Sequence, residues 1–198
     1  MNAPFHPIKK MAPFLLLTTL GVLSGCALGS SSYEVKSLPG TTTTFILVRH
    51  AEKESNDVAS PLSAKGRKRA QALVDEIVPL GVTAIYCPAL RRNKETVQPL
   101  AERLNLEIRT VAGWRLMNTR RFADDFVQKT MAEHAGGVVL WAGNSSAVGD
   151  LGSNLQELYQ RLGGQGRGPH AYHDLFVIAV RDNGAINIQK KQYGQLMP

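Results

Sequence analysis

The sequence TTFILVRH at residues 43–50 decides the fold. Its first six residues are β-branched, aromatic or aliphatic, which is typical of a buried strand. Two side chains that can carry positive charge, Arg49 and His50, follow directly where the apolar run ends. In open α/β sheets, ligands bind beyond the carboxyl ends of the strands. The stretch therefore predicts a strand over 43–48 and a ligand-binding position for Arg49 and His50.

Downstream of this stretch, segments with helical spacing alternate with short apolar segments. Asp182-Asn183-Gly184 separates the last two apolar segments and predicts an antiparallel hairpin. The alternation predicts one α/β domain, a three-layer α/β/α sandwich with a mostly parallel sheet and a C-terminal antiparallel hairpin. The expected helices are a segment capped by Ser63 and segments 94–104, 122–134 and 147–162, and the further expected strands are 82–86, 106–111, 138–142, 175–180 and 185–188.

Polar residues follow three of the predicted strands. Arg49 and His50 follow the first strand, Arg91 and Arg92 lie in the loop after the second, and Gly143-Asn144-Ser145 follows the fourth. The carboxyl ends of parallel strands meet at one edge of a sheet. We therefore expect these side chains to converge on one site.

Three motifs occur in order along the chain. An Arg-His-Ala triplet at 49–51 ends the first strand, PLSAKG at 61–66 begins a helix, and Arg92 lies four residues before Thr96. Together they resemble the signature of the histidine phosphatase superfamily, over a stretch from about residue 44 to residue 180. The resemblance implies a phosphoglycerate mutase-like fold, with His50 as the nucleophile that attacks phosphate and with Arg49 and Arg92 as phosphate-binding residues.

The chemistry of these residue types agrees with a phosphatase. A phosphomonoester carries nearly two negative charges and repels an anionic nucleophile, whereas a neutral imidazole attacks without that repulsion. Guanidinium groups bind phosphate oxygens through paired, charge-assisted hydrogen bonds. The alternative for Arg49 and His50 alone is a strand end with an ion pair to Glu52. The short segment between His50 and Ser63 leaves little room for the extra loops that mutases use.

One position departs from the family pattern. The run LWAGNSS at 140–146 resembles the family segment that carries a second histidine, and this chain has Asn144 at that place. An asparagine amide can donate a hydrogen bond to a phosphate oxygen, but it cannot carry charge or shuttle a proton. Two functions stay open: a phosphomonoester hydrolase of the bacterial envelope with reduced activity, or a catalytically inactive lipoprotein that binds phosphate or phosphoesters.

Further residues are candidates for the same pocket. The sequence does not fix the general acid: Glu52 is a catalytic candidate that could instead orient the loop or pair with Arg49, and Asp57 lies in the following loop. In the family, the strand after His170 and His173 neighbours the first strand. Either histidine could therefore enter the pocket, and the alternative is a loop position without a role.

Three other residues are expected to lie outside the pocket. His134 ends a predicted helix and is expected to be a surface cation there. Cys87 is expected to be a small buried residue rather than a reactive thiol. Arg91 is expected to face solvent beside Arg92.

The first 25 residues have the layout of a secretory signal. Lys9 and Lys10 precede the apolar run 11–23, which is shorter than the roughly 20 residues of an ordinary transmembrane helix. The run ends in Leu-Ser-Gly before Cys26 and resembles the lipobox of bacterial lipoprotein precursors. The alternative is a plain signal peptide with an incidental cysteine. The resemblance implies a signal peptide over 1–25 and acylation of Cys26, with Ala27 resembling the signal for outer-membrane sorting.

Composition completes these expectations. We expect a flexible tether over 26–41, which is rich in Ser and Gly, and the phosphatase-like domain over 42–198. The ordinary share of hydrophobic and charged residues excludes a disordered or fibrous chain. The formal charge of +7 includes two lysines of the signal segment, so the mature chain stays basic, which suits an anionic ligand or membrane surface. No motif indicates a cofactor, a metal or a nucleic acid. The expected partners are a phosphorylated small molecule or envelope phosphoester, and the membrane through the lipid anchor.

Overall fold

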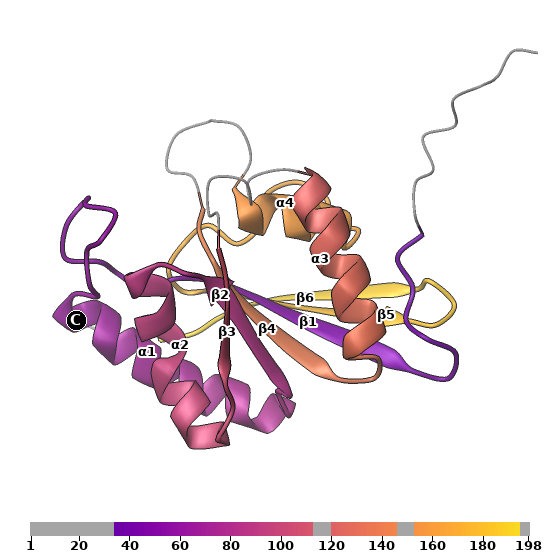
Figure 1. The fold of residues 1–198 in the computed structure, drawn as a ribbon, viewed down its shortest axis with the longest axis horizontal. Coiled ribbons are helices and arrows are strands. Elements are labelled where there is room, and N and C mark those ends of the chain that lie inside the picture. Colours follow the sequence, from indigo (N-terminus) through magenta and orange to yellow (C-terminus); the bar gives the residue numbers. More distant parts are fainter. Residues whose placement is uncertain (1–33, 113–119, 146–152, 195–198) are drawn as a thin grey trace, which may run out of the picture. The chain divides into compact units, whose positions relative to one another are not determined.

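The computed structural model describes residues 34–112, 120–145 and 153–194. By its internal contacts the chain divides after Ser32, and all described residues belong to the unit Tyr33–Pro198 (Figure 1). In chain order the elements are β1 (Thr42–Arg49), α1 (Ala64–Ile77), the short 3-10 helix η1 (Val78–Leu80), β2 (Ala84–Pro88), α2 (Arg91–Leu104), β3 (Ile108–Val111), α3 (Arg120–Glu133), β4 (Val138–Gly143), α4 (Asn154–Arg161), β5 (Asp174–Arg181) and β6 (Ile186–Gln192).

The described strands form a six-stranded sheet in the order β3-β2-β4-β1-β5-β6. Strands β3, β2, β4 and β1 are parallel to one another, and β5 is antiparallel to both β1 and β6. Gly184 closes the β5–β6 turn with a φ of 78°, a backbone conformation that glycine adopts without strain. The predicted α/β class, the mostly parallel sheet and the C-terminal hairpin are confirmed.

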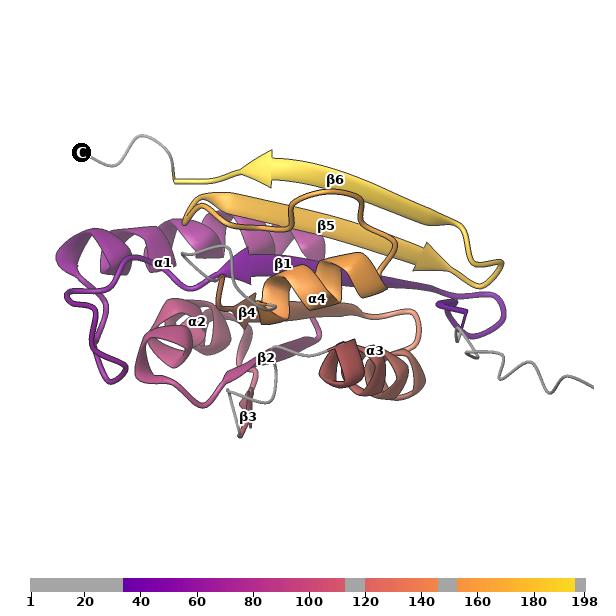
Figure 2. The same ribbon diagram turned by 90° about the horizontal axis from the view of Figure 1, so that it is seen from above.

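Helices cover both faces of the sheet (Figure 2). Along β1, Phe45 and Leu47 point into a core shared with α3 and α4, whereas Ile46 and Val48 point into a second core shared with α1 and α2. All four side chains are fully buried. Strand β1 therefore lies at the centre of a three-layer domain, and its C-terminal end is fixed from both sides.

The start of α1 packs on the loop that follows His50. The Ser63 hydroxyl accepts a hydrogen bond from the Gly66 amide at 3.0 Å, and the Ser63 amide donates to the Glu52 carbonyl at 2.9 Å. A Cβ atom at Gly66 would lie 2.1 Å from the same Glu52 carbonyl oxygen, so that only glycine fits there. The PLSAKG motif thus fixes the loop after the predicted nucleophile.

Helix α2 begins at Arg91, three residues before the expected start, and continues through Pro99. Proline lacks the amide that would bond to the preceding turn, so it weakens the helix locally. Burial of Val97, Leu100 and Ala101 against the sheet stabilises the helix on both sides of it. The earlier start places Arg92 in the first turn.

The domain begins before the expected boundary at residue 42. Val35 is buried in the core, and the Ser37 amide donates to the Arg181 carbonyl at 3.1 Å. The Gly40 amide donates to an Asp182 carboxylate oxygen at 2.7 Å. Residues 34–41, expected to belong to the tether, therefore pack against the β5–β6 end of the domain. This is a correction, and its cause is a pairing between segments far apart in the sequence.

One predicted helix lies only partly within the described residues. The first half of the predicted helix 147–162 lies outside them, and α4 covers the second half. Within the described parts of the chain, no helix is both long and apolar enough to cross a membrane.

Candidate active site

His50 lies at the C-terminal end of β1, one residue past the strand. Its amide donates to the Gly143 carbonyl of β4 at 2.9 Å, which holds its backbone against the neighbouring strand. Only 3% of the residue is exposed. The position is therefore rigid and largely shielded from water.

A backbone carbonyl fixes the tautomer of His50. The imidazole Nδ1 lies 2.8 Å from the Ala51 carbonyl oxygen. Because a carbonyl can only accept, Nδ1 must carry the proton and donate it. The neutral ring then has its lone pair on Nε2, the nitrogen that a nucleophile would use.

Burial and neighbouring cations keep His50 neutral. Burial is the main cause that lowers the pKa of His50 from 6.5 to about 3, and repulsion from Arg92 and Arg49 adds to it. The hydrogen bond to Ala51 opposes the shift and is outweighed. The imidazole is therefore unprotonated at any physiological pH.

Arg49 is held by the loop that precedes β5. Its Nη1 donates to the His170 carbonyl at 2.8 Å, and its Nη2 lies 3.5 Å from the Tyr172 hydroxyl. The guanidinium carbon lies 4.1 Å from the centre of the Tyr172 ring. These contacts tie the first strand to a segment more than 120 residues later.

Arg92 comes from the other side of the pocket and meets Asn144. Its Nη1 donates to the Val58 carbonyl at 2.9 Å and its Nη2 to Asn144 Oδ1 at 3.3 Å. Arg91 instead is exposed and pairs with Glu95 one turn along α2, at 2.6 Å. Arg91 thus faces solvent as expected, and the phosphate-binding role of Arg92 stays a prediction.

The position of Asn144 is itself determined. Its amide donates to Asn154 Oδ1 at 3.0 Å, and the same oxygen accepts from the Trp141 indole at 3.1 Å. With Asn144 Oδ1 bound to Arg92, the side-chain amino group is the part of Asn144 that can donate to a ligand. The structure thus brings Asn144, Arg92 and His50 together at the edge of the sheet where the parallel strands end, as expected from the sequence.

Both arginines keep a buried nitrogen without a partner. The Nε atoms of Arg49 and Arg92 are buried and make no hydrogen bond to any residue that the structure describes. Buried donors without acceptors are unusual and costly, by about 1–3 kcal/mol each. Among the described residues, no ion pair involves Arg49, Arg92 or the neighbouring Lys53. The site therefore holds unneutralised positive charge and spare donors, which fits an anionic ligand.

Thr96 joins the nucleophile loop to Arg92. Its hydroxyl accepts from the Ala51 amide at 2.9 Å and donates to the Arg92 carbonyl at 2.7 Å. One side chain thereby fixes the backbone after His50 relative to the first turn of α2. The four-residue spacing between Arg92 and Thr96 has this structural reason.

The carboxylate of Glu52 faces Arg69, not the pocket. Arg69 Nε and Nη2 donate to it at 2.7–2.9 Å, and Arg69 is 4% exposed. Burial is the largest single influence and would raise the pKa of Glu52. The hydrogen bonds from Arg69, a backbone hydrogen bond and the charges of Arg69 and Lys65 together outweigh burial and lower that pKa. The ion pair anchors the loop after His50 to α1. The catalytic role expected for Glu52 stays untested, and its contacts favour the loop-orienting alternative over a proton donor.

The other acid candidate is also engaged elsewhere. Asp57 is exposed and its Oδ1 accepts from the Ala59 amide at 3.0 Å, within its own loop. The general acid is therefore not assigned among the described residues.

Of the two later histidines, His170 contributes its backbone carbonyl to the site, and His173 makes no contact with it in the described part of the chain. The His170 carbonyl binds Arg49, and burial and nearby cations lower the pKa of its imidazole. The His173 carbonyl accepts from the Tyr193 amide at 3.0 Å and lies farther along the loop. The pocket residue of this loop is Tyr172, whose ring centre lies 5.7 Å from that of His50.

Sequence reasoning missed Tyr172 and Lys53. Tyr172 lies between the two candidate histidines, His170 and His173. The signal that could have indicated it is an aromatic residue close in sequence to a predicted cationic site. Lys53 follows the family triplet closely. Burial and repulsion from Arg92 and Arg49 lower its pKa, which places it in the same cationic group.

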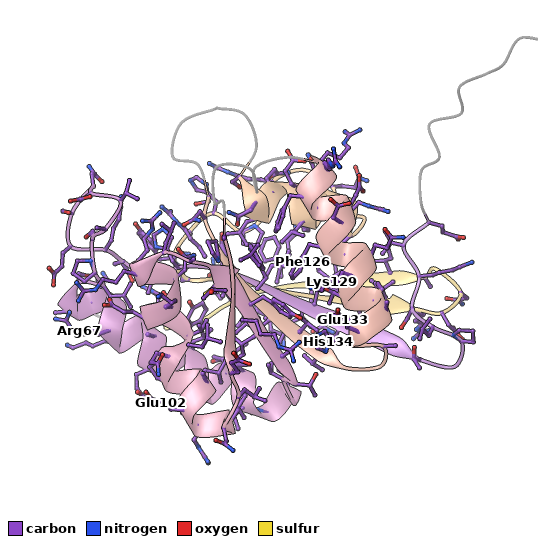
Figure 3. All side chains as sticks on the ribbon, viewed as in Figure 1. Arg67, Glu102, Phe126, Lys129, Glu133 and His134 are labelled. Atoms are coloured by element: carbon purple, nitrogen blue, oxygen red, sulfur yellow. The ribbon has the colours of Figure 1, made fainter. Side chains whose placement is uncertain are left out.

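His134 and Cys87 lie apart from this group. Figure 3 shows His134 at the end of α3, next to Glu133. Its Nε2 lies 2.9 Å from the Tyr86 hydroxyl and 3.1 Å from Arg109 Nη1, and burial and Arg109 lower its pKa. The expected surface cation is therefore wrong, because Arg109 can only donate and needs a neutral imidazole. Cys87 is buried, which raises the pKa of its thiol to about 12.

Comparison with known proteins identifies the class. The histidine phosphatase superfamily (branch 1) matches residues 45–173, well over half of the chain. The protein belongs to that superfamily. The match covers the strand before His50, the PLSAKG segment, Arg92 and the loop up to His173.

The individual proteins that match this chain do so over a short stretch or at low sequence identity. The 8-oxo-(d)GTP phosphatase of Mycolicibacterium smegmatis (strain ATCC 700084 / mc(2)155) is 33% identical over 73 residues, covering 34% of this chain and 23% of that protein. The chain thus spans about a quarter of that curated relative's length. The protein histidine phosphatase SixA complexed with tungstate matches with a TM-score of 0.58 and 12% identity, over 75% of this chain and 96% of SixA. Phosphoglycerate mutase from Bacillus anthracis str. Sterne matches with a TM-score of 0.54 and 14% identity, over 76% and 93%. These structural matches establish the phosphoglycerate mutase-like fold.

Proposed function

We propose that this protein is a phosphomonoester hydrolase that works through a phosphohistidine at His50. One observation carries the proposal: a buried, neutral imidazole with its lone pair on Nε2 lies among Arg49, Arg92 and Lys53, and no carboxylate pairs with these cations in the described residues. Such a site attracts a phosphate dianion and does not repel it from the nucleophile.

The proposed reaction has two displacements at phosphorus. His50 Nε2 forms a bond to phosphorus while the bond to the leaving oxygen breaks, and that oxygen takes up a proton. Water then attacks phosphorus, the P–N bond breaks, and inorganic phosphate leaves with the imidazole neutral again. Arg49, Arg92 and the Asn144 amide would hold the non-bridging oxygens and stabilise their charge in both transition states.

The substrate is proposed to be a phosphorylated small molecule or an envelope phosphoester. The names of the relatives support phosphoryl substrates of several kinds, from a nucleotide to phosphohistidine. The basic balance of the chain supports an anionic substrate.

Turnover by wild-type protein and His50→Ala tests this function. A chromogenic aryl phosphate and a panel of phosphorylated sugars, nucleotides and glycerol phosphates are the substrates, with Arg91→Ala as a matched surface control. Wild type and Arg91→Ala should hydrolyse at least one of them at similar rates, and His50→Ala should lose at least about 10³-fold. Equal hydrolysis by wild type and His50→Ala would contradict the proposal.

We further propose that the protein is a lipoprotein anchored through Cys26, in the bacterial envelope and facing the periplasm from the outer membrane. Eight residues, Cys26 to Tyr33, would then separate the lipid from the described domain, a reach of at most about 29 Å.

Metabolic labelling with an alkyne fatty acid tests the anchor. The full chain should incorporate the label and sediment with membranes, and Cys26→Ser should do neither. Labelling of the Cys26→Ser protein to the same extent would contradict lipidation at that residue.

A second function is favoured by Asn144 alone. Without the second histidine of the family, the pocket could bind phosphate or a phosphoester without turning it over. Loss of one donor to the transition state typically costs about 10²–10³ in rate. Phosphate-dependent thermal stabilisation without hydrolysis of any panel member would support this binding function, and activity gained in Asn144→His would locate the defect.

A further inference from the structure

The loop 169–174 supplies a wall of the pocket that no motif indicated. Three groups of this loop contact or face Arg49: the His170 carbonyl at 2.8 Å, the Tyr172 ring centre at 4.1 Å, and the Tyr172 hydroxyl at 3.5 Å. The Tyr172 ring also lies close to His50, at 5.7 Å between ring centres and with 58° between the planes. Tyr172 therefore touches the proposed clamp and borders the proposed nucleophile.

This loop is held in place by its own contacts. One carboxylate oxygen of Asp174 accepts hydrogen bonds from the amides of His170 and Ala171, both at 2.8 Å. The Ser145 hydroxyl donates to the His170 carbonyl at 3.2 Å. These hydrogen bonds fix the shape of the loop, and the loop in turn fixes the position of Arg49 through the His170 carbonyl.

These contacts hold both terminal nitrogens of Arg49 against the loop. Nη1 is bound by the His170 carbonyl, and Nη2 lies beside the Tyr172 hydroxyl. Nε is buried and has no hydrogen-bond partner within 34–112, 120–145 and 153–194. A flexible arginine side chain would lose rotamer freedom on gripping a ligand, and a face-on aromatic ring that holds it beforehand removes part of that loss. A desolvated arginine over an aromatic face is typically stabilised by enough to change a binding constant severalfold or more.

We propose that Tyr172 is a positioning residue for Arg49, and that its ring holds the guanidinium in place beside His50 for contact with the phosphoryl group. This inference rests on the proposed function of the pocket. The ring carries the effect, because the stacking distance is short, whereas the hydroxyl lies at the outer limit of a hydrogen bond. The hydroxyl is therefore dispensable and the aromatic face is not.

Tungstate binding, measured by calorimetry on the purified full chain, tests this role. Tyr172→Phe keeps the ring and is the matched control for Tyr172→Leu, which removes it. We expect Tyr172→Phe to bind within about twofold of wild type and Tyr172→Leu to bind about 3–30-fold more weakly. A double-mutant cycle with Arg49→Ala then isolates the coupling. In the Arg49→Ala background, Tyr172→Leu should change the affinity by less than about twofold.

The outcomes separate the inference from the function it rests on. Tungstate binding by wild type with no loss in Tyr172→Leu, or with the same loss when Arg49 is absent, overturns the positioning role alone. No tungstate binding by wild type overturns the proposed pocket, and the inference with it. If Tyr172→Leu does not fold, Asp174→Asn provides the test. It weakens the anchor of the loop, and its loss of affinity should likewise vanish in the Arg49→Ala background.

Discussion

By sequence the pocket has two parts: residues 49–96 form the nucleophile side, and Asn144 with the loop 169–174 forms the later side. In space the two parts contact each other, because Arg92 bonds to Asn144 and Arg49 stacks on Tyr172. The first side consists of short-range motifs: Thr96 bonds to both Ala51 and Arg92, and Gly66 fits against Glu52. The second side joins segments distant in sequence, and it carries the departure from the family. The three motifs that resemble the family therefore lie on the nucleophile side, whereas the departing position, Asn144, lies on the later side.

The largest expected effect concerns the anchor of the nucleophile side. Glu52→Gln removes the charge that neutralises the buried Arg69 guanidinium. Breaking a buried ion pair typically costs about 3–5 kcal/mol. We expect a loss of this size in the free energy of unfolding, measured by urea denaturation. A change of less than about 1 kcal/mol would show that the carbonyls bonded to Arg69 suffice without Glu52.

The second prediction compares adjacent residues of α2. Arg92→Ala removes a donor from the pocket, whereas Arg91→Ala removes only an exposed pair with Glu95. We expect Arg92→Ala to lower kcat/KM by about 10²–10³-fold. Arg91→Ala should change it by less than about threefold, since exposed pairs contribute little. Equal effects of the two variants on steady-state hydrolysis would place the phosphate elsewhere.

Much of this arrangement follows from the sequence. The apolar run before Arg49 predicts β1, and the parallel sheet brings Arg92 and Asn144 to the same edge as His50. The Arg69–Glu52 pair and the Tyr172 contact could not be predicted, because they depend on how α1 and the loop before β5 pack in three dimensions. The packing of segment 34–41 on the domain could not be predicted for the same reason, since its partners lie near residue 181.

A third prediction concerns Thr96, which links the Arg-His-Ala triplet at 49–51 to Arg92. Thr96→Val keeps the shape of the side chain and removes the acceptor for the buried Ala51 amide. An unsatisfied buried donor costs about 1–3 kcal/mol. The unfolding free energy should fall by that amount in urea denaturation. An unchanged value would mean that the amide finds another acceptor.

The last prediction is a pH dependence, whose effect is gradual per pH unit and accumulates toward pH 3. The pKa of His50 is about 3 in the folded protein against 6.5 as its ordinary value. Below pH 6.5 the unfolded chain binds a proton that the folded chain excludes, so stability falls as the pH drops toward 3. The loss should reach at most about 1.4 kcal/mol per pH unit relative to His50→Gln. Parallel stability curves for the two proteins over pH 3–6.5 would contradict the buried, neutral state of His50.

The nucleophile itself can be observed directly. Wild-type protein mixed with an aryl phosphate, quenched during turnover under alkaline denaturing conditions and digested, should carry one phosphoryl group on the peptide that contains His50. The same peptide from His50→Ala should carry none, and that variant should not release phosphate. A phosphoryl group on another residue, or undiminished hydrolysis by His50→Ala, would contradict the central claim that His50 attacks phosphorus.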